Sequence, residues 1–145
     1  MSVRSKRVRT IAVAAASLTF AVMAMAEDKS LNCDNAMTTL YINQCAAMQL
    51  ASAQAELRQY VEASVTHHAD DSELVTAIEY SQQAWEAYVT AHCDAVHTQW
   101  RDGSIRGVMA LTCKTELTQQ RTHTVWASFL TYMDSTPPVL PEPSL

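Results

Sequence analysis

Glycine and proline are scarce in this 145-residue sequence, which contains two glycines and four prolines. Neither residue occurs from Glu27 to Asp102, a run of 76 residues. A β protein of that length needs residues that form turns, so their absence argues against a mainly β fold and favours helices. The chain length predicts a single domain with a modest core.

No apolar run reaches the roughly 20 residues that cross a bilayer. The longest run, from Ile11 to Ala26, spans 16 residues and ends in the small-x-small pattern of Ala24 and Ala26. Four cations precede it, namely Arg4, Lys6, Arg7 and Arg9. These features predict a secretory signal peptide over residues 1–26, cleaved between Ala26 and Glu27. We therefore expect a periplasmic or secreted protein with no membrane anchor in its mature form.

Positive charge is sparse once this leader is removed. Cleavage takes away four of the ten Lys and Arg residues and none of the 15 Asp and Glu residues, so the net charge falls from −5 to about −9. Such a field repels phosphate backbones, which argues against a nucleic-acid partner. It also raises the rate of encounter with cationic partners.

The remaining pattern predicts an all-α, antiparallel up-down-up bundle of three helices. We expect the first helix over residues 34–67, the second from about Asp71 to the glycine-bearing stretch at 101–107, and the third over 104–133. The helical domain would cover residues 27–135, followed by a disordered proline-rich tail over 136–145.

Periodicity assigns faces to two of these helices. The second helix carries one stripe with alternating steps of four and three residues: Leu74, Ile78, Ser81, Trp85, Tyr88, His92 and Ala95. We interpret the Trp85–Tyr88 pair within it as core packing. Asp70 and Glu73 resemble a capping box at the start of this helix. Apolar positions of the first helix include Met37, Tyr41, Met48, Leu57 and Val61.

The four cysteines include no C-x-x-C pair, which argues against a zinc knuckle or a thioredoxin-type motif. In a secreted chain they predict two structural disulfides. Within one helix Cys33 and Cys45 would lie about 18 Å apart, so they should not pair unless the first helix starts later. Facing positions in an antiparallel hairpin favour Cys45–Cys93, which leaves Cys33–Cys113.

Titratable residues form no catalytic constellation. The densest cluster is His67 and His68 beside Asp70 and Asp71, where a metal site is one reading. The reading we favour is that these side chains complement the dipoles of two helix ends. We expect no enzyme activity, no cofactor and no metal.

The sequence resembles the lysozyme inhibitor LprI N-terminal-like family of small secreted bacterial proteins over about residues 33–130. The residues that carry this resemblance are Cys33, Asn43-Gln44-Cys45-Ala46, Leu57, Tyr60, Gln83-Ala84-Trp85, Tyr88, Cys93, Gly103-Ser104, Cys113, Leu117-Thr118 and Arg121. The resemblance implies a binding protein that inhibits lysozyme or a related peptidoglycan-cleaving enzyme. The alternative is a structural or envelope-stress module with an unknown protein partner.

Two segments could contact a basic lysozyme. The loop from Arg101 to Gly107 combines glycine with exposed charge, and Arg101 or Arg106, beside Asp102, could meet carboxylates in the lysozyme groove. The corner at Asp70 and Asp71 would instead match the basic exterior of lysozyme. The oligomeric state stays open.

Overall fold

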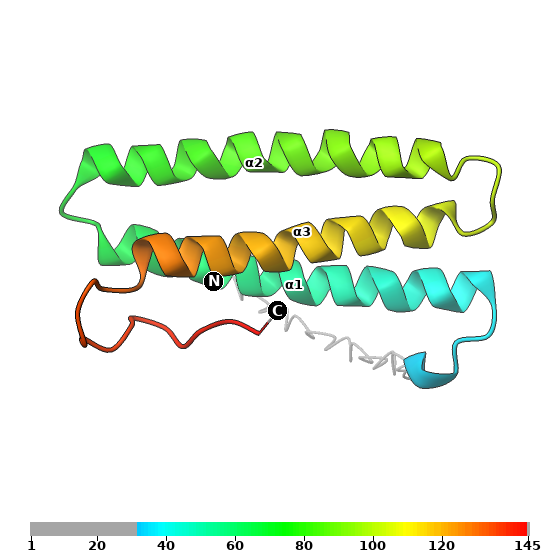
Figure 1. The fold of residues 1–145 in the computed structure, drawn as a ribbon, viewed down its shortest axis with the longest axis horizontal. Helices are drawn as coiled ribbons and strands as arrows, with labels where there is room; N and C mark the ends of the chain where they lie inside the picture. Colours follow the sequence, from blue (N-terminus) through cyan, green and yellow to red (C-terminus); the bar gives the residue numbers. More distant parts are fainter. Residues whose placement is uncertain (1–31, 145) are drawn as a thin grey trace, which may run out of the picture. The chain divides into compact units, whose positions relative to one another are not determined.

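The computed structural model describes residues 32–144; the predicted signal peptide and its cleavage site lie outside the described residues. A short 3-10 helix, η1 (Cys33–Asn35), precedes three α-helices: α1 (Thr39–His67), α2 (Ser72–Gln99) and α3 (Arg106–Phe129). The three helices run antiparallel to their neighbours in sequence (Figure 1). The predicted all-α up-down-up bundle is therefore confirmed.

Side-chain caps set where the first two long helices begin. Thr38 Oγ1 accepts a hydrogen bond from Tyr41 N at 3.2 Å, and Asp71 Oδ1 accepts one from Leu74 N at 3.0 Å. Each cap satisfies a backbone N–H that has no partner within the helix. The N-cap of α2 is thus Asp71, not the Asp70 of the predicted capping box. Similarly, α1 begins at Thr39, five residues later than expected.

α3 packs most extensively against α1 and less against α2, while α1 and α2 make little contact with each other. The buried core cluster consists of Leu57 and Tyr60 from α1 with Val125 and Leu130 at the end of α3. Trp85 is the α2 residue that packs against it. The core therefore lies near the α1–α2 turn rather than midway along the bundle.

The buried stripe of α2 departs from the prediction in its second half. Tyr88, at 52% exposure, is not core, and its ring stacks on His92 with centroids 5.5 Å apart. The more buried positions are instead Val89, Cys93 and Val96. A strict alternation of four and three residues has a period of 3.5, which drifts by about 20° per heptad against the 3.6-residue turn of a straight helix.

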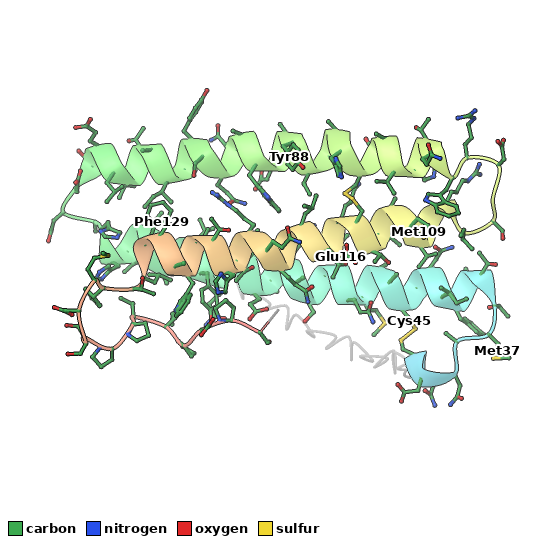
Figure 2. The ribbon with its side chains drawn as sticks, viewed as in Figure 1. Met37, Cys45, Tyr88, Met109, Glu116 and Phe129 are labelled. Carbon is green, nitrogen blue, oxygen red and sulfur yellow. A yellow bond between two sulfur atoms is a disulfide. The ribbon has the colours of Figure 1, made fainter. Side chains whose placement is uncertain are left out.

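The structure pairs the cysteines differently from the prediction. Cys33 is bonded to Cys45 and Cys93 to Cys113, with Cα–Cα distances of 5.6 and 5.7 Å (Figure 2). The predicted pairs Cys45–Cys93 and Cys33–Cys113 are therefore wrong.

The late start of α1 explains the first pair. Cys33 lies in η1, outside α1, so the intervening chain folds back and brings it beside Cys45. The second pair obeys the hairpin rule, applied to α2 and α3 instead of α1 and α2, because Cys93 and Cys113 lie equally far from Gly103. Both disulfides are local, with sequence separations of 12 and 20. Within the described residues, α1 is therefore joined to the α2–α3 hairpin by packing and not by a disulfide.

The proline-rich tail differs from the expected disordered segment. Leu140 packs against the core cluster, and Pro143 is buried. Side chains from α1 and α3 hydrogen-bond to carbonyl groups of this segment. The tail is thus held by donors that lie far from it in the sequence.

Candidate functional site

The two predicted contact segments lie at opposite ends of the bundle (Figure 1). The Arg101–Gly107 segment follows the C-terminus of α2, whereas Asp70 and Asp71 precede its N-terminus. The 28 residues of α2 span about 42 Å. The two segments therefore form alternative sites rather than one small contact.

The loop at 100–105 is ordered by its own hydrogen bonds. Gly103 N donates to Trp100 O at 2.9 Å, and Arg106 N donates to Gly103 O at 3.4 Å. Each arginine also donates one guanidinium N–H to a nearby carbonyl: Arg101 Nη1 to Thr98 O at 3.4 Å and Arg106 Nη1 to Arg101 O at 3.1 Å. Guanidinium groups have five N–H donors, so most of these donors stay available to a partner.

Charge at the loop is not neutralised locally. Arg101, Asp102 and Arg106 are all exposed. None of the ion pairs among residues 32–144 involves these three side chains. The loop thus presents two cations and one anion on a chain whose net charge is −5.

Two apolar side chains flank these arginines and were not predicted as contact residues. Trp100 and Ile105 are each 41% exposed, although both are large and hydrophobic. Tryptophan and arginine dominate the binding energy of protein interfaces. Trp100 could have been noticed in the sequence, because it lies outside the α2 stripe and directly before the loop.

The opposite end is occupied mainly by contacts within the fold. Asp71 is committed to the α2 N-cap, and His68 Nε2 lies 2.9 Å from Phe129 O, at the end of α3. His67 packs edge-on against Tyr132, with ring centroids 6.0 Å apart. Asp70 is exposed and remains available. This corner therefore offers a partner less free charge than its sequence suggests.

A groove of about 500 Å³ runs between α1 and α2, over α3. Its lining mixes apolar and charged groups of both signs: Leu57, Val61, Trp85 and Val89 with Arg58, Glu62, Glu86 and Lys114. Among the described residues, no group of three or more His, Cys, Asp or Glu is placed to hold a metal ion.

Arg121 joins α3 to α2 beside this groove. Its Nη2 donates to Ser81 Oγ at 2.9 Å and its Nε to Gln82 Oε1 at 3.2 Å. Burial lowers the pKa of this guanidinium. Arg121 thus positions α2 on α3 rather than facing a partner.

No helix in the part of the chain that the structure describes is long and apolar enough to cross a membrane. The family model for lysozyme inhibitor LprI matches residues 32–124, which is well over half of the chain. No curated protein and no solved structure matches the chain. The matched range contains all four cysteines and the 100–105 loop, and it ends within α3 before the tail. The chain therefore belongs to the lysozyme inhibitor LprI family.

Proposed function

We propose that this protein is a periplasmic or secreted inhibitor of a lysozyme or a related peptidoglycan-cleaving enzyme, and that it binds through the loop end of the bundle. The observation that carries the proposal is the family match over residues 32–124. We define the loop-end surface as Trp100, Arg101, Asp102, Ile105 and Arg106. Inhibition by surface contact requires no catalytic group or cofactor.

Electrostatics act at two ranges in this proposal. The net charge of about −9 on the mature chain would draw it towards a basic lysozyme and speed encounter. At contact, Arg101 and Arg106 would meet the carboxylates that such enzymes carry in their grooves. Trp100 and Ile105 would supply the apolar contact beside them.

We base the proposed cellular location on the N-terminal leader sequence and on the two disulfides. Residues 1–26 have the sequence of a secretory signal peptide, with cleavage between Ala26 and Glu27. Disulfides persist in oxidising compartments, and both pairs in this chain are formed.

A lysis assay tests the proposal. The oxidised mature chain, residues 27–145, is mixed with lysozymes of different classes, and the clearing of a peptidoglycan suspension is followed. We expect stoichiometric inhibition of at least one class, weakening as salt rises. An acidic, disulfide-bonded protein of unrelated fold serves as the control. Equal inhibition by that control, or none of any class, would overturn the proposal.

Paired variants test the loop. R101A/R106A removes two exposed cations from the loop, and R58A/K114A removes two cations from the α1–α2 groove. Each hydrogen bond to a charged group is worth about 1.5–3 kcal/mol, so losing both loop arginines should weaken binding about 100-fold or more. Titration calorimetry measures both variants. Equal loss in the two variants would show that net charge matters and the loop does not.

One observation favours the alternative, a structural or envelope-stress module with a different protein partner. Residues 35–55 contain no charged residue or histidine, yet Met37, Tyr41 and Met48 on this stretch are 88%, 47% and 56% exposed. An apolar contact of this kind would be insensitive to salt. Complexes with a partner that persist at high salt, together with no inhibition of lysis, would favour this alternative.

A further inference from the structure

After α3 the chain turns back and runs along the side of the bundle formed by α1 and α3 (Figure 1). We call residues 136–144 the tail. They contain all four prolines of the sequence, at positions 137, 138, 141 and 143. The family match ends at residue 124, so the tail lies outside the matched range.

Two aromatic side chains hold the tail by its backbone carbonyls. Trp126 Nε1 donates to Leu140 O at 2.9 Å, and Tyr60 Oη donates to Pro141 O at 2.7 Å. Trp126 comes from α3 and Tyr60 from α1, so the two helices grip consecutive carbonyls. A proline-rich segment has few backbone N–H donors, because proline has none. Aromatic grooves that bind such segments therefore donate hydrogen bonds to their backbone carbonyls.

The tail also donates one backbone hydrogen bond, from Val139 N to Leu130 O, and its side chains make further contacts. Leu140 packs against the core cluster, and Pro143 is buried. Glu142 Oε1 lies 3.1 Å from His123 Nε2. The side-chain contacts therefore involve an apolar residue at 140, an acid at 142 and a buried proline at 143, while Pro141 contributes its carbonyl.

The three side chains that hold the tail lie on helices, and one backbone group beside them, Leu130 O after α3, accepts a hydrogen bond from Val139 N of the tail at 2.8 Å. Tyr60, His123 and Trp126 lie on α1 and α3, whose backbone hydrogen bonds are made within each helix. Most of the tail remains exposed, including Pro137, Pro138 and Glu142. Proline restricts the unbound strand as well, which reduces the entropy lost when it binds.

We propose that Tyr60, His123 and Trp126 form a binding site for an extended proline-rich peptide of the type Leu-Pro-Glu-Pro. The tail is its built-in occupant, and a proline-rich segment of a partner polypeptide takes its place. The site is separate from the loop-end surface, so this inference is independent of lysozyme inhibition.

The test uses the full mature chain with a fluorescently labelled peptide of residues 135–145. L140S/E142Q weakens the contacts between the tail and the bundle and substitutes no residue of the helices. We expect this variant to bind the unmodified peptide at least tenfold more tightly than the wild-type chain does, because its own tail competes less. Adding Y60F, which removes only the donor hydroxyl, should weaken binding at least fivefold. Y80F removes an exposed hydroxyl on α2 and is the matched control.

Three results would overturn the proposal. The first is no saturable binding by L140S/E142Q while its helical circular dichroism is intact. The second is equal effects of Y60F and Y80F. The third is a wild-type dimer in sedimentation that L140S/E142Q abolishes, because the occupant would then be the tail of a second copy.

A second measurement keeps the proposal testable if L140S/E142Q does not fold. A spin label on the peptide, added in excess to the wild-type chain, should broaden the NMR signal of the Trp126 indole N–H. The Trp100 indole, at the far end of α2, should keep its line width. Equal broadening of both signals, or of neither, would contradict a site at Trp126.

Discussion

Replacing Gly107 with alanine tests how closely α3 approaches α1. A Cβ atom at Gly107 would lie 2.8 Å from Asn43 Oδ1 and 3.3 Å from Asn43 Cγ. Turning the amide over would place Nδ2 at the position that Oδ1 now occupies, so it does not relieve the contact. No glycine among the described residues has a positive φ, so Gly107 is needed for space and not for backbone conformation.

The expected cost follows from two opposing terms. Overpacking a tight contact costs about 1–3 kcal/mol, while alanine gains up to about 1 kcal/mol over glycine in a helix. G107A should therefore be about 1–2 kcal/mol less stable than the wild-type chain. For a domain of this size the midpoint of thermal unfolding would fall by about 4–8 °C, measured by circular dichroism on the oxidised protein.

Two further variants make the reasoning refutable. G103A is the control, because its Cβ would lie 3.4 Å from Trp100 O, an ordinary contact, and its stability should change by less than about 0.5 kcal/mol. N43A should restore at least half of the stability lost in G107A, because it removes the amide that the new methyl group meets. Additive effects of N43A and G107A, or equal midpoints for G107A and G103A, would refute the close approach.

Three other predictions follow from particular contacts. Trypsin cleaves after Lys29 and Arg58, so an unreduced digest should release residues 30–58 as a single peptide with an internal disulfide between Cys33 and Cys45. Any peptide linking Cys45 to Cys93 would contradict the structure. Burial of the hydroxyl, and to a lesser extent the negative charge of Glu56, raise the pKa of Tyr60. The contribution of Tyr60 to folding stability is therefore complete below the ordinary tyrosine pKa of about 10 and is lost as pH rises through the raised value. Absorbance at 295 nm should then show one tyrosine ionising after the others, and Y60F should lack that step. R121M should lose about 1–3 kcal/mol in urea unfolding through its bonds to Ser81 and Gln82, whereas K114M, which breaks an exposed ion pair with Asp94, should lose less than about 1 kcal/mol; equal losses would count against the role of Arg121.

The helical architecture was predictable because its signals are local. The absence of glycine and proline up to Asp102 argues against the many tight turns of a β fold, and the two glycines lie in and directly after the loop between α2 and α3. The start of α1 was harder to predict. Thr38 is its cap, but residues 35–55 carry no charge and a blurred apolar period, so nothing in the pattern stops a helix from beginning at residue 34.

The predicted cysteine pairing was wrong because it depended on the same helix start. With α1 beginning at residue 34, Cys33 and Cys45 are too far apart to bond. With α1 beginning at Thr39, the preceding turn brings them together. A shift of five residues in a helix start therefore changed the whole disulfide pattern.

The ordered conformation of the tail could not be predicted from sequence patterns, for a different reason. Its composition is typical of disorder, and that reading is sound for a strand without partners. What orders it here is a donor on Tyr60, 81 residues away from Pro141 in sequence, and a second donor on Trp126. Local composition carries no information about a contact between residues that are so far apart in the sequence.

Order in the bundle comes from different sources at its two ends, and this bears on the proposed binding surface. The core cluster of Leu57, Tyr60, Val125 and Leu130 lies near the α1–α2 turn. Towards the other end, Cys93 and Cys113 join α2 to α3. These cysteines lie seven and eight residues, about two turns, from the two edges of the 100–105 loop.

A covalent link constrains a loop without requiring its side chains to be buried. The loop can therefore be held in place while Trp100 and Ile105 remain exposed. If hydrophobic packing held the loop in place, the same apolar side chains would be buried inside the fold and could not contact a partner. The disulfide thus leaves the loop-end surface both ordered and free, which is what tight binding by a small inhibitor requires.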